Sequence, residues 1–347
     1  MLPKPCPALI PRIPSRFSTT LAVLLPALLL FGGCQSHPSP TVTRSTKVVP
    51  APPAKKPAVA PAPVKAPAAA EALLVVLSDS SSAYGRLVEI IRTRSDRETT
   101  ILSLDTPLPG EHSLASQLQA SQGPVIAIGI EAANFLAAQA SQRDIVFALV
   151  FNHRDHRLLA QGMIGISMLP PPEQVLRLFK AISPQVTTLV LPVSPDLASY
   201  AALARTEASK LGLSLDTPEI GNDKELLLLT RKLDPAIRGL WLLPDNRVVS
   251  KDSLQQIMAG SVKNGRQTIV FSPTLFPLGG LLSAEYDEEA TVVTILEAIT
   301  ASAEHRRKLR GQLLRPRASR LTLNPGMVET LGLTVPPQFR PLLQVDR

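Results

Sequence analysis

Short apolar runs alternate with amphipathic segments over most of the chain. The first run, Leu73–Leu77, is uniformly apolar and has the length of a strand buried on both faces. A polar loop over residues 78–84 follows it, and the next segment, up to Arg94, has the apolar spacing of a helix. Repeated strand–loop–helix units of this kind predict an α/β fold with parallel sheets covered by helices on both faces.

The unit recurs in two groups, which predicts two lobes with a cleft between them. A long helix is expected over residues 288–309, near the end of the chain. The expected strands are Leu73–Leu77, Thr99–Leu104, Val125–Gly129, Ile145–Phe151 and Met163–Met168 in the first group, and Thr188–Leu191, Ser214–Thr217, Leu240–Leu243, Thr268–Phe271, Leu281–Tyr286 and Arg320–Leu323 in the second.

The N-terminus has the features of a bacterial lipoprotein signal over residues 1–33. Three basic residues precede an apolar stretch that is short for a membrane span and ends in Phe31-Gly-Gly-Cys34, which resembles a lipobox. After cleavage Cys34 is the sole cysteine, and acylation explains an unpaired thiol in an exported chain. An ordinary signal peptide with an incidental cysteine is the alternative. Gln35 follows the cysteine, and a residue other than aspartate at that position favours sorting to the outer membrane if the source is Gram-negative.

Residues 34–70 predict an extended tether rich in proline and alanine. At ~3.1 Å per residue it reaches up to about 110 Å. This segment has five basic residues and no acidic residue. The basic side chains are either solvated or available to anionic lipid and cell-wall polymer. The net charge of +8 comes from the residues before position 71, and the remainder is formally neutral. A basic groove for nucleic acid is therefore not expected.

Polar residues that follow the predicted strands are the candidate ligand contacts, because ligands of α/β sheets bind at the carboxyl ends of strands. Helix capping is the alternative for Ser81, Asp245 and Asn246. We expect a small-molecule ligand to contact Ser80, Ser81, Tyr84, Glu131, Asn152, Ser194, Asp245, Asn246, Ser272 and Tyr286.

No catalytic, cofactor or metal site is expected. The loop over residues 153–156 has two histidines and an aspartate, but no distant ligand completes a zinc site, and a surface loop is favoured. The sequence lacks nucleophile-elbow, phosphate-loop and zinc-protease motifs. Trp241 lies in the middle of a strand and is expected to pack between sheet and helix.

Four segments carry a family resemblance: Trp241–Ser250 (WLLPDNRVVS), Leu191–Pro195, Ile145–Ser167, and the closing run over residues 320–336. They resemble substrate-binding proteins of ABC transporters of the tryptophan or tyrosine type. Asn152-His153 stands where that family has Asp-Pro.

The resemblance implies a type I periplasmic-binding-protein fold with two Rossmann-like lobes and three crossings between them. The first lobe would hold residues 71–167 and 287–312, and the second residues 168–286 and 313–347. Function would be closure on an amino-acid-like solute, with an ABC permease as partner. The alternative is an envelope lipoprotein that keeps the fold and acts as a regulatory or interaction module on another envelope protein.

Overall fold

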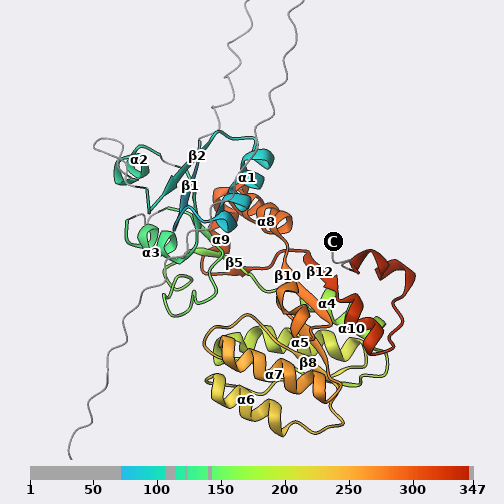
Figure 1. The fold of residues 1–347 in the computed structure, drawn as a ribbon. Coiled ribbons are helices and arrows are strands. Elements are labelled where there is room, and N and C mark those ends of the chain that lie inside the picture. Colours follow the sequence, from blue (N-terminus) through green and yellow to red (C-terminus); the bar gives the residue numbers. More distant parts are fainter. Residues whose placement is uncertain (1–71, 107–113, 122, 140–142, 344–347) are drawn as a thin grey trace, which may run out of the picture. The chain divides into compact units, whose positions relative to one another are not determined.

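Two six-stranded sheets form the centres of two lobes (Figure 1). The computed structural model describes residues 72–106, 114–121, 123–139 and 143–343. Residues 65–347 form one compact unit, and both sheets lie inside it. The predicted signal peptide over residues 1–33, the lipidation site Cys34 and the tether over residues 34–70 lie outside the described residues.

The first lobe is built on a sheet whose strand pairs are all parallel, in the order β11-β5-β4-β3-β1-β2. Its strands are β1 (Leu73–Leu77), β2 (Thr99–Ser103), β3 (Val125–Ile128), β4 (Ile145–Ala148), β5 (Ile164–Ile166) and β11 (Leu313–Leu314). Its helices are α1 (Ser82–Arg94), α2 (Leu114–Ala120), α3 (Ile130–Gln139), α8 (Glu288–Thr300) and α9 (Ala303–Leu309).

Alternate residues of β1 explain why an uninterrupted apolar run suits this sheet. Leu73, Val75 and Leu77 pack with α1 and α8 on one face, whereas Leu74 and Val76 pack with α2 and α3 on the other. Successive strand side chains point to opposite faces, so a strand covered on both sides must be apolar throughout. The predicted doubly covered α/β fold is confirmed.

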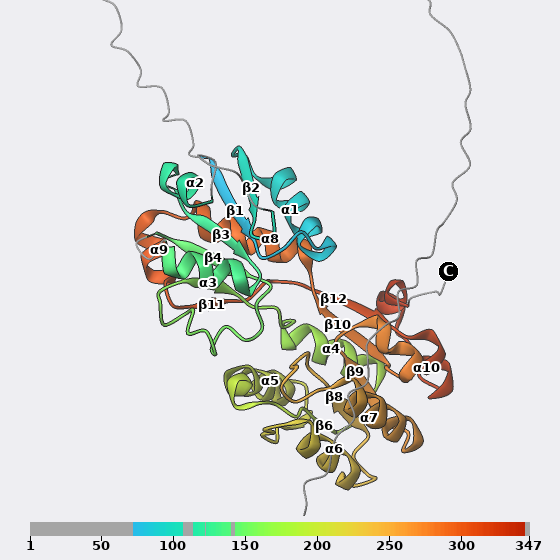
Figure 2. The same cartoon turned by 60° about the vertical axis from the view of Figure 1, so that its left-hand side comes forward.

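The second lobe repeats this plan with the sheet order β12-β10-β9-β8-β6-β7. β12 runs antiparallel to β10, and the other pairs are parallel. The strands are β6 (Thr188–Val190), β7 (Ser214–Asp216), β8 (Gly239–Trp241), β9 (Gln267–Val270), β10 (Leu282–Tyr286) and β12 (Ser319–Leu323). The α-helices are α4 (Pro172–Ile182), α5 (Ala198–Lys210), α6 (Asp223–Lys232), α7 (Lys251–Lys263) and α10 (Pro325–Thr330) (Figure 2).

The chain crosses between the lobes three times, as the resemblance implies: between β5 and α4, between β10 and α8, and between β11 and β12. The last crossing differs in detail from the expectation. β11 pairs with β5 of the first sheet, so the chain passes to the second sheet after Leu314, whereas the boundary was expected at residue 313. A two-residue strand is too short for its apolar pattern to assign it to a sheet.

The prediction of a single long helix over residues 288–309 is wrong. The structure has α8 and α9 with a break at Ala301-Ser302, where the Ser302 side chain accepts a hydrogen bond from the His305 amide and caps α9. A serine that caps a new helix competes with continuation of the preceding one. None of the helices in the described ranges has the length and hydrophobicity needed to span a bilayer.

Candidate functional site

The loop after β1 is fixed against α3 in the first lobe. The Ala132 amide at the start of α3 donates to Ser78 Oγ at 3.0 Å. Gly129, between β3 and α3, has φ +88°, and a Cβ there would lie 2.4 Å from Ser78 Oγ and 2.6 Å from Tyr84 Oη. Only glycine allows this conformation and this close approach. The predicted contact Tyr84 thus lies beside the β3–α3 turn, at the carboxyl edge of the sheet.

Ser80 and Asp105 join the loops after β1 and β2. The Ser80 amide and hydroxyl each donate to the Asp105 carboxylate at 2.9 Å, and Ser103 Oγ donates at 2.5 Å. The bond from Ser103 and then those from Ser80 lower the pKa of Asp105 to about 2. A hollow of about 320 Å³ lies here and is lined in part by Ser80, Ser81, Ser103 and Thr106. The first lobe therefore offers hydroxyl groups next to an ionised carboxylate.

Two predicted contacts of the second lobe, Ser194 and Asp245, lie together. Ser194 Oγ donates to Asp245 Oδ2 at 2.5 Å, and the Arg247 amide and Nε donate to Oδ1 at 3.1 and 3.2 Å. Both Ser194 and Asp245 are buried. The alternative that Asp245 or Asn246 caps α7 is wrong, because Ser250 caps it in a reciprocal capping box with Ser253.

Arg247 links this buried carboxylate to the first lobe. Its Nη1 pairs with Asp196 and lies 3.5 Å from Asp155, which belongs to the loop after β4. Arg154 of the same loop lies 3.9 Å from Asp196. These half-exposed pairs each contribute about 0.2–1 kcal/mol. The loop over residues 153–156, expected to be a plain surface loop, therefore faces charged groups of the other lobe.

A small cavity of about 60 Å³ lies between the loop after β4, the crossings and the start of α5. Phe151 and His153 line it from the first lobe, and Tyr200 lines it from the second. Burial, and then the Arg154 charge, lower the pKa of His153, whose ring lies 5.9 Å from that of Phe147. The rings of His153 and Phe151 give this cavity apolar surface, and Arg154, Asp196 and Arg315 add charged groups to its lining.

Strain marks the loop that leads to this cavity. Leu149 has φ +58°, a left-handed conformation that is uncommon for a non-glycine residue. Phe151, two residues later, is 44% exposed, although large apolar side chains are usually buried. Strained backbone persists where the surrounding structure holds it and is frequent at binding sites.

Tyr286, another predicted contact, lies at the β10–α8 crossing. The adjacent Glu288 carboxylate accepts from Arg86 of α1 at 3.0 Å and from Arg320 of β12 at 3.2 Å, so it connects the two lobes. Burial, and then the Glu288 charge, raise the pKa of Tyr286. This tyrosine is half-buried beside the crossing.

The other predicted contacts do not converge on one network of hydrogen bonds. Glu131 is exposed in the first turn of α3, and Asn246 is exposed next to Asp245. Ser272 caps the short helix after β9 through the Thr274 amide at 3.3 Å. The Asn152 carbonyl accepts from the Asp155 amide at 3.1 Å, which folds its loop back.

The cross-lobe charges are the residues that sequence reasoning missed: Arg154, Asp155, Asp196 and Arg247. Arg247 lies within the segment of resemblance, and its charge next to Asp245 is the signal that could have identified the network. Within the described ranges, no group of three or more His, Cys, Asp or Glu residues is placed to hold a metal ion. Trp241 is 1% exposed and packs edge-on against Tyr200 at 6.0 Å, which confirms its core position.

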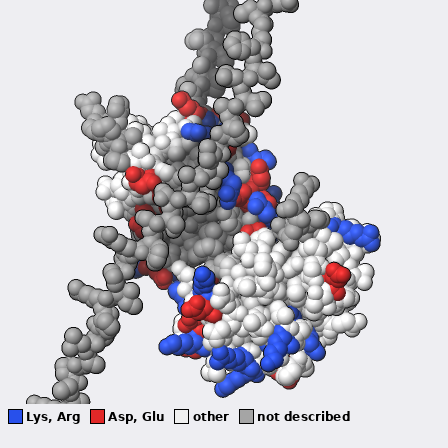
Figure 3. All heavy atoms as spheres, viewed as in Figure 1, with Lys and Arg blue, Asp and Glu red and all other residues white. Residues whose placement is uncertain are grey.

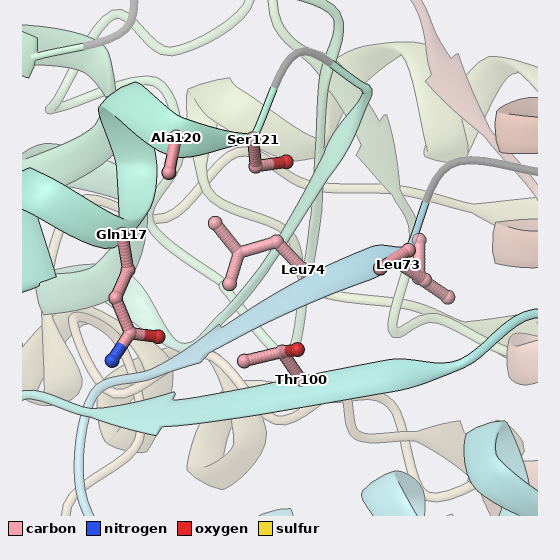
Figure 4. A pocket seen from close by; sticks show the side chains of 7 residues that line it. Leu73, Leu74, Thr100, Gln117, Ala120 and Ser121 are labelled. Atoms are coloured by element: carbon pink, nitrogen blue, oxygen red, sulfur yellow. The ribbon is translucent and has the colours of Figure 1, made fainter.

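The first lobe also has a larger hollow, of about 410 Å³, away from these loops (Figure 4). Leu73, Leu74 and Thr100 line it from the amino ends of β1 and β2, and Gln117 and Ala120 line it from α2. Ligands of parallel sheets bind at the opposite, carboxyl ends of the strands. Choosing the binding site by hollow volume alone would therefore place it at the wrong edge of the sheet.

The strand orders, the three crossings and the facing carboxyl-end loops define the two-lobe periplasmic-binding-protein fold. A ligand-free, open substrate-binding protein with adhesive properties from Clostridium difficile matches with a TM-score of 0.53 and 14% identity, covering 80% of this chain and 100% of that chain. A conserved domain protein from Vibrio cholerae matches at 0.51 with 18% identity, covering 79% and 98% of the two chains.

An ABC domain in complex with L-Trp from Streptococcus pneumonia matches at 0.50 with 17% identity, covering 78% of this chain and 98% of that chain. Identities this low show the fold alone. No protein-family model and no curated protein matches the sequence.

Proposed function

We propose that this chain is a lipid-anchored, extracytoplasmic solute-binding protein that closes its lobes on a small, amino-acid-like ligand. The observation that carries the proposal is the meeting of carboxyl-end loops from both sheets, where Arg247 and Asp196 of one lobe pair with Asp155 and Arg154 of the other. Ligands of such folds are held between the lobes by polar groups from these loops.

An amino-acid-like ligand suits the chemistry of these loops. Ser81 and the amino end of α1 provide donors for a carboxylate, and Asp105, which Ser80 holds in place, provides an acceptor for an ammonium group together with Asp155 and Asp196. The exposed Phe151 provides an apolar surface for a side chain. The structural neighbour from Streptococcus pneumonia holds L-Trp, which supports this class of ligand. ABC import is the corresponding role, with a permease as partner.

Thermal unfolding of residues 65–347 with each proteinogenic amino acid tests the proposal. A ligand at about 100 times its Kd stabilises the folded state by about 2.7 kcal/mol. For a chain of this size that raises Tm by roughly 4–5 °C. Stabilisation by at least one amino acid is expected. A flat response to the whole panel would count against a solute-binding role.

A second candidate function is a regulatory or interaction module anchored in the envelope. The observation that favours it is the self-pairing of the site: Asp245 is already bonded to Ser194 and Arg247, and Arg247 also pairs with Asp196. Affinity purification of the full-length chain from its own membranes separates the two roles. A permease and an ATPase among the bound proteins favour import, whereas another envelope protein without them favours the module.

A further inference from the structure

The second lobe separates its charges between the two ends of its strands. Four exposed cations, Arg231, Lys232, Arg238 and Lys263, lie where α6 leads into β8 and α7 leads into β9. We name these four residues the basic edge. They lie at the amino ends of β8 and β9, away from the loops at the carboxyl ends of the strands. Figure 3 shows basic side chains gathered over this end of the second lobe, near α6 and α7.

Hydrogen bonds show that the two loops of the basic edge are adjacent. Arg238 Nη1 donates to the Asn264 carbonyl at 2.9 Å. Arg266 is only 3% exposed, and its guanidinium donates to the carbonyls of Thr230, Leu233 and Ile237 at 3.3, 3.1 and 3.3 Å. The cations are therefore held in one continuous region around a buried arginine.

These cations have no acidic partners. In the described part of the chain, no carboxylate lies within 4.0 Å of the basic edge or of Arg266. Asp234, the acidic residue of the α6–β8 loop, instead accepts a hydrogen bond from the Ala236 amide at 2.8 Å. Burial, and then repulsion by Arg238, lower the pKa of Arg266. The four cations of the basic edge outnumber Asp234, so this surface carries a net positive charge.

The carboxyl ends of α6 and α7 explain where these cations lie, but they do not neutralise the charge. Arg231, Lys232 and Lys263 lie in the last turns of α6 and α7, where basic residues are favoured by the helix carbonyls. Arg238 and Arg266 lie in the loops that follow and also contact helix ends. Arg238 donates to the carbonyl of Asn264, the C-cap of α7, and Arg266 donates to the carbonyls of Thr230 and Leu233 at the end of α6. Carbonyl dipoles carry only partial negative charge, so this surface keeps a net positive charge.

Building on the lipid anchor of the proposed function, we propose that the basic edge binds anionic lipid headgroups of the same membrane. The tether predicted over residues 34–70 ends close to β1 and is long enough, up to about 110 Å, to let the second lobe lie on the bilayer. Exposed cations near an anionic leaflet are each attracted by about 1 kcal/mol, or about fivefold in partitioning. If the second lobe contacts the membrane through this edge, the loops at the carboxyl ends of its strands stay accessible to solute.

Cosedimentation of residues 65–347 with phosphatidylcholine vesicles containing about 40% phosphatidylglycerol tests the proposal without the lipid anchor. Binding is expected at low salt, with loss in about 0.5 M NaCl, where the Debye length is only a few ångströms. Lys232→Gln/Lys263→Gln should lower the partition coefficient about 25-fold. The matched control is Arg92→Gln/Arg177→Gln, which removes the same charge from two exposed residues elsewhere.

Equal losses in the two double variants, no binding to the anionic vesicles, or equal binding to vesicles of phosphatidylcholine alone would each overturn the proposal. Far-ultraviolet circular dichroism of every variant checks that the fold is retained. The measurement does not depend on a solute, so a negative result here leaves the solute-binding proposal intact, and the reverse also holds.

Discussion

Replacement of Asp245 by alanine should destabilise the protein even when no solute is present. The carboxylate accepts three hydrogen bonds: one from Ser194 Oγ, and two from the amide and Nε of Arg247. Ser194 is 3% exposed, and its hydroxyl also accepts from Arg247 Nη2 at 3.4 Å, so removal of Asp245 would leave its proton without an acceptor in a site that water reaches poorly. An unsatisfied buried polar group costs about 1–3 kcal/mol. Loss of the partly exposed Arg247 pair adds about 1 kcal/mol after solvent screening.

The expected loss in free energy of unfolding is thus about 2–4 kcal/mol, measured by urea denaturation of residues 65–347. Asp245→Asn keeps an acceptor for the Arg247 amide and should lose less, about 1–2 kcal/mol. Asn246→Ala is the matched control, because this neighbour is exposed, and it should change stability by less than about 0.5 kcal/mol. If Asp245→Ala lowers the free energy of unfolding as little as the control does, the structural role of Asp245 is refuted. A role in ligand binding would then remain for this residue.

Three further predictions follow from the geometry of the loops. Gly129→Ala should destabilise by more than about 2 kcal/mol in urea denaturation, because of its positive φ and its close neighbours, whereas Gly260→Ala, in open space within α7, should stabilise by up to about 1 kcal/mol; equal effects would contradict this. A double-mutant cycle of Asp155→Asn and Arg247→Gln should give a coupling energy of about 0.2–1 kcal/mol that falls in high salt, and a coupling insensitive to salt would argue against the cross-lobe pair. Because serine hydrogen bonds hold the pKa of Asp105 at about 2 in the folded state, below its ordinary 3.8, its contribution to stability is present above pH ~4 and is lost as the pH falls toward ~2. Asp105→Asn should flatten the stability profile between these values, and an unchanged profile would contradict the assignment.

The sequence predicted the fold well because burial on both faces leaves a strong local signal. Leu73–Leu77 matches the structural strand at both ends, since each of its side chains lies in the core. The break between α8 and α9 was missed because it depends on a single capping bond from Ser302, and neither glycine nor proline marks it in the sequence. The pairing of β11 with the first sheet depends on tertiary contacts of two residues.

The site was predicted less completely because its pairs join residues far apart in sequence. Ser194 and Asp245 were each expected as strand-end polar residues, but their mutual hydrogen bond follows from the adjacency of β6 and β8. The Arg247–Asp155 pair depends on loops of different lobes meeting. The near-zero net charge of residues 71–347 likewise conceals the basic edge, since composition says nothing about how charges are distributed.

Small-angle X-ray scattering of residues 65–347, with and without the amino acid that raises Tm most, tests the closing of the two lobes most directly. Closure on a solute predicts a smaller radius of gyration in the bound state, because the two lobes approach each other. A radius of gyration that is unchanged at saturating amino acid would contradict this account of how the protein works.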